Sequence, residues 1–319
     1  MKIQNPHDRF FKETLGKVEV AKDFLNNYLP GNIIKVIDVD TLEPQKDSFI
    51  NKELQEGFSD LLFKANINNR EGYIYFLFEH KSYTRKDIAF QLLRYMMEIW
   101  ETKSKKEKAD ELPVIIPLVV YHGKDRWKIG TTLGEMIVGY KDLPEDIKKF
   151  TPNYEYLLYD LSQFTDDEIK GEAQLRILFT TLRDIFTKDS KSLQDSVFRA
   201  VSYLRELDDK KTGIEYFETL MRYIFNARAD LTRADFNEVV KKIETTYPEG
   251  SEVVMTLAEI FREEGKEEGI LKGMEVGAKQ GKIEVAKNAI REGMELGLIE
   301  KLTGLPKKEI GKIAKEIEN

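Results

Sequence analysis

The amino-acid sequence predicts an α/β fold followed by an all-helical C-terminal extension. Runs of aromatic and branched residues, bounded by Asn, Gly or charged residues, occur at 58–64, 73–82 and 112–123, and such runs are typical of buried strands. From the middle of the chain onward, apolar residues instead recur three and four positions apart, which is the spacing of amphipathic helices. These patterns predict an α/β domain at 1–160 and a helical extension at 161–252.

The composition is that of a globular chain without disulfides. No cysteine is present, which excludes disulfides and thiolate metal sites, and three scattered histidines are too few for a zinc site. The N-terminus lacks the apolar stretch of a signal peptide, and the longest apolar run, 114–121, is far shorter than the roughly 18 residues that span a bilayer. We therefore expect a cytoplasmic protein with no membrane segment. The net charge of -7 argues against bulk coating of nucleic acid but leaves a local basic groove open.

A first helix is predicted over residues 6–29. Asn5 suits the N-cap, Pro6 suits the first helical position, and Asp8 in the first turn complements the helix dipole. His7 and Asp8 are also adjacent ionisable groups, so the sequence allows a catalytic pair as an alternative to capping.

The next elements are predicted to form a β-hairpin after a polar connection. Residues 58–64 and 73–82 are the two strands, and the Asn-rich segment 66–72 is the turn. Apolar residues fall on both parities of the second strand, so it should be covered on both faces and lie centrally in the sheet. This strand nevertheless ends in three ionisable residues, 79–81.

A helix of about five turns is predicted after the hairpin. Thr84 and Asp87 match a capping box, and a charged linker is expected at 101–111. Gln91 occupies the apolar stripe of this helix, where a leucine would be expected, and Tyr95 shares its face. The pair is therefore a candidate for the same cleft as the strand carboxylates, although a glutamine satisfied at the edge of the stripe is the alternative.

The charged end of the second strand has the chemistry of a magnesium site. Glu79 and Lys81, two positions apart in a strand, belong to one face, and an unpaired charge there would be costly. Asp60 interrupts the neighbouring strand in the same way, so a hairpin can bring both carboxylates together. Mg²⁺ prefers hard oxygen ligands, with water and phosphate completing its shell. A nearby ammonium group could activate water, which suits phosphodiester hydrolysis.

The tail, residues 253–319, begins with glycines at every fourth position, from Gly265 to Gly281. Five glycines inside a helix would cost about 4 to 5 kcal/mol relative to alanine, so close packing of a partner helix is one explanation and a frayed linker is the other. The charged residues between them exclude a bilayer. We expect self-association through this ladder.

The last residues predict two or three short helices with a turn at Gly304 and Pro306. This arrangement is similar to a helix-turn-helix, in which the second helix enters a DNA groove. A small packing unit without DNA contact is the alternative.

The site residues resemble those of a known superfamily. Asp60 followed by Glu79-x-Lys81, on adjacent strands between two helices, resembles the PD-(D/E)XK nucleases, whose restriction-endonuclease-like core is an αβββαβ sandwich. Gln91-x-x-x-Tyr95 is similar to a motif that some members carry on the helix after the lysine.

Within this superfamily the chain most resembles the Rpn, or recombination-promoting nuclease, family. The segments that carry the resemblance are NPHDRFFKETLG, DLLFK, FEHKS, QLLRYM, IPLVVYHG and LTGLPKKEI. The sequence departs from the superfamily pattern at Ser59, where a proline is usual, and many relatives have glutamine at the position of Lys81.

The resemblance implies a Mg²⁺-dependent DNA endonuclease linked to recombination or mobile elements. Asp60 and Glu79 would ligate the metal, with the backbone carbonyl of His80 as a further ligand. Lys81 would serve the attacking water, and Gln91 with Tyr95 would hold substrate or the lysine. The rival hypothesis is a catalytically silent DNA-binding or self-associating protein on a nuclease-like scaffold.

Overall fold

The structure is a computed structural model that describes residues 5–45, 59–79, 86–107, 110–187, 190–207, 210–228 and 280–318, with the single residues 238, 241 and 245. Contacts divide the chain into two compact units, residues 2–255 and residues 256–319. The predicted boundary at residue 160 stays a prediction.

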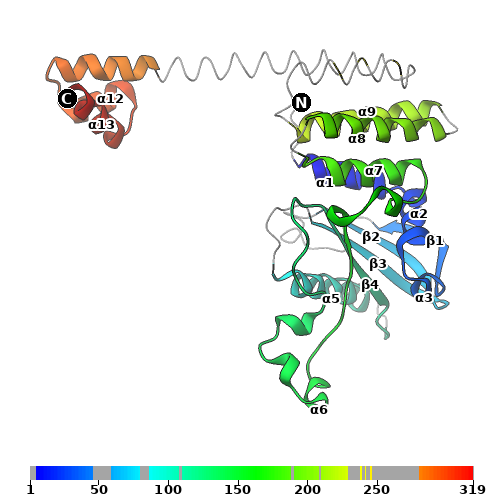
Figure 1. Cartoon of the computed structure of the whole chain (residues 1–319). Helices are drawn as coiled ribbons and strands as arrows, with labels where there is room; N and C mark the ends of the chain where they lie inside the picture. The colour runs from blue at the N-terminus through cyan, green and yellow to red at the C-terminus, as the bar shows by residue number, and fades with distance from the viewer. Residues whose placement is uncertain are drawn as a thin grey trace. The chain divides into compact units, whose positions relative to one another are not determined.

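The larger unit is built on a five-stranded mixed sheet (Figure 1). Its strands are β1 (Ile37–Gln45), β2 (Ser59–Ile67), β3 (Arg70–Glu79), β4 (Val114–Tyr121) and β5 (Leu157–Asp160). They lie side by side in chain order, antiparallel from β1 to β3 and parallel from β3 to β5. Helix α5 connects β3 to β4, as a parallel pair requires a crossover. The predicted α/β class is confirmed.

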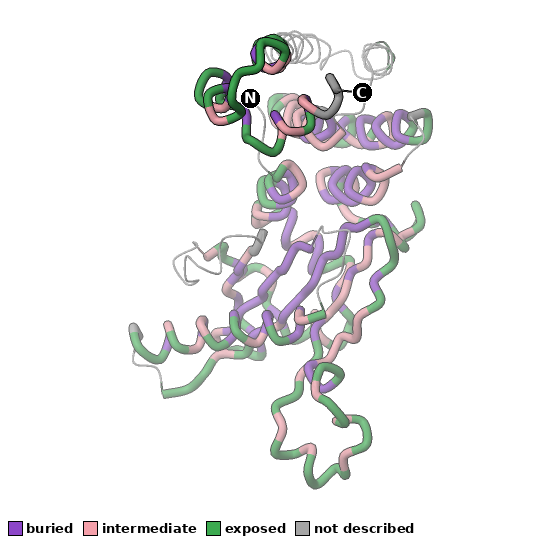
Figure 2. The backbone as a smooth tube through the Cα atoms, turned by 90° about the vertical axis from the view of Figure 1, so that its left-hand side faces the viewer, coloured by how far each residue is buried: buried purple, intermediate pink, exposed green. Residues whose placement is uncertain are grey.

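The β2–β3 hairpin was predicted from sequence and is present, with a tighter turn than expected. Only Asn68 and Asn69 separate the strands, and both have positive φ angles, 51° and 60°. Two-residue hairpin loops favour this geometry because it matches the strand twist, and asparagine tolerates it. β3 lies between β2 and β4, and the residues from Tyr73 to Glu79 are all buried, so the central position is confirmed (Figure 2).

Two strands were missed by the sequence analysis. β1 lies in the segment predicted to be a polar connection, because it is an edge strand in which only Ile37 and Leu42 are buried. Its pairing with β2 also shifts register between Asp38 and Glu43, which breaks the alternation that marks a strand. β5 is only four residues long and carries little pattern of its own.

Helices cover both faces of the sheet (Figure 1). The described helices of this unit are α1 (Pro6–Leu15), α2 (Val18–Tyr28), α3 (Gly31–Ile34), α5 (Ile88–Glu107), α6 (Glu145–Lys148), α7 (Ala173–Asp184), α8 (Ser190–Tyr203) and α9 (Lys210–Ala227). Short 3-10 turns occur at Leu133–Met136, Tyr140–Asp142, Leu161–Gln163, Asp166–Glu168 and Leu204–Glu206. Among the described residues after 160, the regular elements are helical, as predicted.

Aromatic contacts define the two faces. The face that carries Tyr75 and Leu77 packs against α5 through Leu92 and Tyr95. The opposite face packs against α1, where the rings of Phe11 and Phe78 stack at 4.2 Å, and against Phe24 of α2, whose ring also meets Phe179 of α7. Helices α8 and α9 cover α7 and α1 as an outer layer. The sheet is therefore buried on both sides, as parallel pairing demands.

Two helix boundaries differ from prediction. The predicted first helix is two helices, because the chain turns at Gly16 and is extended at Lys17 (φ −74°, ψ 130°). A Cβ at Gly16 would clash with the carbonyl oxygen of Lys12, so glycine permits the break. Asn5 stands at the N-cap with φ 50°, but its side chain makes no capping bond. The predicted charged linker is helical as far as Glu107, as part of α5.

The smaller unit has a core of its own. Residues 280–291 are helical and are followed by α12 (Leu296–Thr303) and α13 (Lys307–Glu318). The turn between α12 and α13 lies at Gly304, whose φ is 67°, as predicted. Isoleucines, alanines and one leucine fill the centre: Ile283, Ala286, Ala289, Ile290, Ile299, Leu305, Ile310 and Ile313.

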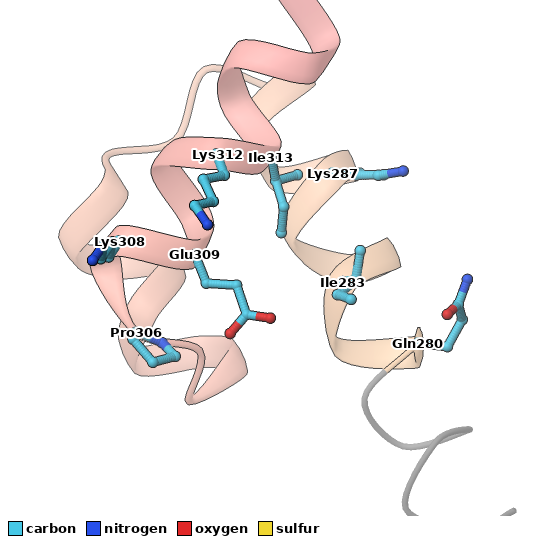
Figure 3. Close-up of a pocket in the computed structure, with 8 residues that line it drawn as sticks. All are labelled: Gln280, Ile283, Lys287, Pro306, Lys308, Glu309, Lys312 and Ile313. Carbon is cyan, nitrogen blue, oxygen red and sulfur yellow. The ribbon is translucent and has the colours of Figure 1, made fainter.

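A groove of about 660 Å³ opens between the helix at 280–291 and α13 (Figure 3). Ile283 and Ile313 contribute its apolar lining, and the lysine side chains Lys287, Lys308 and Lys312 stand around it with one carboxylate, Glu309.

Gly281 is the one ladder glycine among the described residues. Outside its own helix backbone and chain neighbours, no atom of the described residues lies within 4 Å of the Cβ that another residue would have there, so the described part of the chain gives this position no close helix neighbour. The other four ladder glycines lie outside the described residues.

Candidate active site at the carboxyl ends of the parallel strands

Three parallel strands end level with one another and bring three polar residues side by side. Glu79 of β3 is in register with Tyr121 of β4, and Tyr121 with Asp160 of β5. In parallel neighbours these positions belong to the same face, which here is the face covered by α5. Ligand sites of open α/β sheets commonly lie at the carboxyl ends of such strands.

Glu79 is the buried carboxylate predicted from the sequence. Glu79 is only 1% exposed, although it is charged, and it ends a strand whose preceding residues are apolar. Its backbone carbonyl accepts a hydrogen bond from the N–H of His122, at 2.8 Å, which joins the ends of β3 and β4. The backbone that carries this carboxylate is therefore held on one side by the next strand.

Asp60 lies one diagonal step from Glu79. The antiparallel register pairs Asp60 with Leu77, and Glu79 is two residues further along β3 on the face of Leu77. Opposite residues of an antiparallel pair belong to one face, and diagonal neighbours are about 7–8 Å apart. The strand register thus brings together the two positions from which carboxylates were expected to converge.

Gln91 and Tyr95 both lie on α5, over the same face of the sheet. Gln91 is 5% exposed and Tyr95 is fully buried, and the Gln91 Nε2 lies 3.5 Å from the Tyr95 hydroxyl. The Tyr95 ring packs against Tyr75 at 5.2 Å between ring centroids. The Oε1 of Gln91 is buried and accepts no hydrogen bond from the described residues.

His80 and Lys81 lie outside the described residues. The predicted roles of the His80 carbonyl and the Lys81 ammonium group therefore stay predictions, as does the capping box that includes Thr84.

Tyr121 was missed by the sequence analysis. It is fully buried, and its hydroxyl has no hydrogen-bond partner among the described residues. Burial, with smaller contributions from Asp160, Asp125 and Glu79, raises the pKa of its phenol to about 12. A buried apolar run gave no reason to single out its last residue. The feature that identifies Tyr121 is its register with Glu79, and this register is set only when β3 and β4 pair in the sheet.

Asp160, also missed, has a structural role. Its Oδ2 accepts the backbone N–H of Trp127 at 2.8 Å, and its Oδ1 accepts the N–H and the hydroxyl of Ser162 at 3.1 Å and 2.6 Å. These bonds fasten the loop after β4 to the end of β5.

The side chains of His7 and His122 meet on the opposite face of the sheet, where the His122 ring also stacks on Phe78. The His7 Nδ1 lies 2.8 Å from the Tyr223 hydroxyl and 3.1 Å from the His122 Nε2. The His122 ring stacks on Phe186 at 4.6 Å between ring centroids. The His7 side chain thus contacts Tyr223 of α9 and His122, which follows β4.

The donor set suits a hard divalent cation. Glu79 and the diagonal position Asp60 carry carboxylates, which are oxygen donors of the kind that Mg²⁺ accepts. Among the described residues, no group of three His, Asp or Glu forms a complete protein cage. Mg²⁺ sites built from one or two carboxylates do not need one, because water and phosphate supply the remaining ligands.

Comparison with known proteins identifies the family. The sequence model of the family described as "Putative transposase, YhgA-like" matches residues 5–212. The chain is 29% identical over 308 residues to the inactive recombination-promoting nuclease-like protein RpnE of Escherichia coli K12, covering 96% of both chains. This chain belongs to the Rpn family.

Two further Rpn relatives carry the name of nuclease. The recombination-promoting nuclease RpnA of E. coli K12 is 29% identical over 307 residues, covering 96% of both chains. RpnD of E. coli O157:H7 is 29% identical over 257 residues, covering 80% of this chain and 93% of RpnD. No solved structure gives a significant match. No helix among the described residues is long and apolar enough to cross a membrane.

Proposed function

We propose that this Rpn-family chain is a Mg²⁺-dependent DNA endonuclease of the PD-(D/E)XK type that acts in recombination or on mobile elements. The observation that carries the proposal is the buried Glu79 at the carboxyl end of the central strand, diagonal to Asp60 across the β2–β3 hairpin. The order of elements supports it, since helices, three antiparallel strands, one helix and a parallel strand follow one another as in the αβββαβ core.

In this proposal each residue has a role set by its position. Asp60 and Glu79 hold Mg²⁺, with the His80 carbonyl as a further ligand. Bound Mg²⁺ would supply positive charge next to the phosphate and acidify a water. Lys81, two residues beyond Glu79, orients or deprotonates the attacking water. Gln91 and Tyr95 hold the substrate or the lysine from the side of α5.

The test is cleavage of supercoiled plasmid with and without Mg²⁺. The variants Glu79→Gln and Asp60→Asn keep the shape of each side chain and remove its charge. Loss of Mg²⁺-dependent nicking in both supports the proposal. Glu43→Gln, an exposed acid on β1, is the matched control and should cleave like the wild type.

A silent binding protein is the second candidate, and one observation favours it. The relative named inactive, RpnE, is as similar to this chain as RpnA is. This candidate predicts that the wild type and both acid variants retain plasmid in a gel shift to the same extent and that none of them nicks it.

We also propose that the chain self-associates through the glycine ladder. In the full-length chain, the substitutions Gly269→Leu and Gly273→Leu should each lower the molar mass of the assembly measured by light scattering. Gly311→Leu, at a half-buried glycine of α13 with open space where a Cβ would stand, is the control. An unchanged mass in the ladder variants would end this part of the proposal.

A further inference from the structure

The side chain of Tyr121 places a hydroxyl group in the interior of the protein. Its hydroxyl is buried at the end of β4 and finds no hydrogen-bond partner among the described residues. Burying a hydroxyl unpaired is unfavourable, and nearly all such groups in folded proteins are bonded. A group of this kind at the edge of a proposed site therefore points to a ligand.

The surroundings determine what the hydroxyl can bind. A tyrosine phenol, whose ordinary pKa is about 10, is protonated at neutral pH and is a hydrogen-bond donor. Asp160 does not need it, because both of its oxygens already accept bonds from Trp127 and Ser162. Space for the phenol is provided by Gly123, since a Cβ there would overlap the Tyr121 ring and hydroxyl.

We propose that Tyr121 is a further substrate-binding residue of this site, and that its hydroxyl donates a hydrogen bond to a nonbridging oxygen of the bound phosphodiester. The inference rests on the proposed function. Tyr121 is level with Glu79 on the neighbouring strand and on the same face, so a phosphate held next to the Glu79 carboxylate lies on the side of the phenol. A neutral donor can face a phosphate without competing for the cation.

The test compares Tyr121→Phe with a matched tyrosine. Tyr156 packs in the same core, but its hydroxyl donates to the Gly130 carbonyl at 3.1 Å. Without ligand, Tyr121→Phe should unfold at the wild-type temperature or higher, because it removes an unpaired group, whereas Tyr156→Phe should unfold at a lower temperature. In Mg²⁺-dependent cleavage, Tyr121→Phe should lose about 10- to 100-fold in kcat/KM, the worth of one hydrogen bond to a charged group, and Tyr156→Phe should lose little.

The outcomes separate this inference from the proposed function. A wild type that does not cleave with Mg²⁺ overturns both. If the wild type cleaves, Glu79→Gln does not, and Tyr121→Phe cleaves at the wild-type rate, only the role of Tyr121 is overturned. A fall in unfolding temperature for Tyr121→Phe as large as that for Tyr156→Phe would also overturn it, since the hydroxyl would then have a partner within the protein.

Discussion

The start of β3, at the opposite end of the strand from Glu79, carries an ion cluster whose contribution to stability should depend on pH. Glu71 accepts from the Lys103 ammonium group at 2.7 Å, from Lys64 at 2.9 Å and from the Tyr73 hydroxyl at 3.0 Å. Burial by itself would raise the pKa of Glu71. The hydrogen bonds from Lys103, Lys64 and Tyr73 outweigh it and lower the pKa to about 2, from an ordinary 4.5.

The size of the effect follows from linkage. Lowering a carboxyl pKa from 4.5 to about 2 corresponds to at most about 3.4 kcal/mol of stability. The Glu71 side chain is 36% exposed, so solvent screening reduces this to about 1–2 kcal/mol. Because the folded-state pKa is the lower one, the contribution is present above pH 4.5 and is lost as the pH falls toward 2. At pH 3 more than half of it should be gone.

Urea unfolding of the wild type and Glu71→Gln at pH 7 and pH 3 measures this contribution. The wild type should be more stable by about 1–2 kcal/mol at pH 7, and the gap should shrink by about 1 kcal/mol at pH 3. Glu101→Gln, which breaks an exposed ion pair with Lys105, is the control and should change stability by less than about 0.5 kcal/mol at either pH. If the unfolding free energies of the wild type and Glu71→Gln differ by the same amount at pH 7 and pH 3, the lowered pKa of Glu71 does not contribute to stability as described.

Three further predictions concern stability. Asn69→Val should destabilise the hairpin by about 1–2 kcal/mol because a β-branched residue resists a φ of 60°, while Asn69→Gly should be close to neutral in urea unfolding. Gly72→Ala should cost about 1–3 kcal/mol by crowding the Ile67 side chain, and a thermal midpoint equal to wild type would contradict this. Tyr223→Phe should cost about 1–2 kcal/mol, since the half-buried His7 ring loses a partner at 2.8 Å; wild-type stability in calorimetry would show that this bond contributes nothing.

Much of the site's framework is readable from local pattern. The hairpin, the central strand and the following helix each leave a periodic signal in a few neighbouring residues, so Glu79, Gln91 and Tyr95 could be assigned to elements in advance. The edge strand β1 left none, because an edge strand with one exposed face needs few apolar residues. The break at Gly16 was also missed, since an apolar stripe continues through it and a single glycine is tolerated in many helices.

What the sequence by itself determined is where the strongly patterned strands and helices lie and which of their residues are more polar than their positions suggest. Only the tertiary structure decided which positions meet: that Asp60 lies diagonal to Glu79, that Tyr121 ends level with it, and that His7 reaches His122 on the other face. Strand register and the side of the sheet to which a helix packs depend on contacts between residues far apart in the chain, and local periodicity does not encode these contacts.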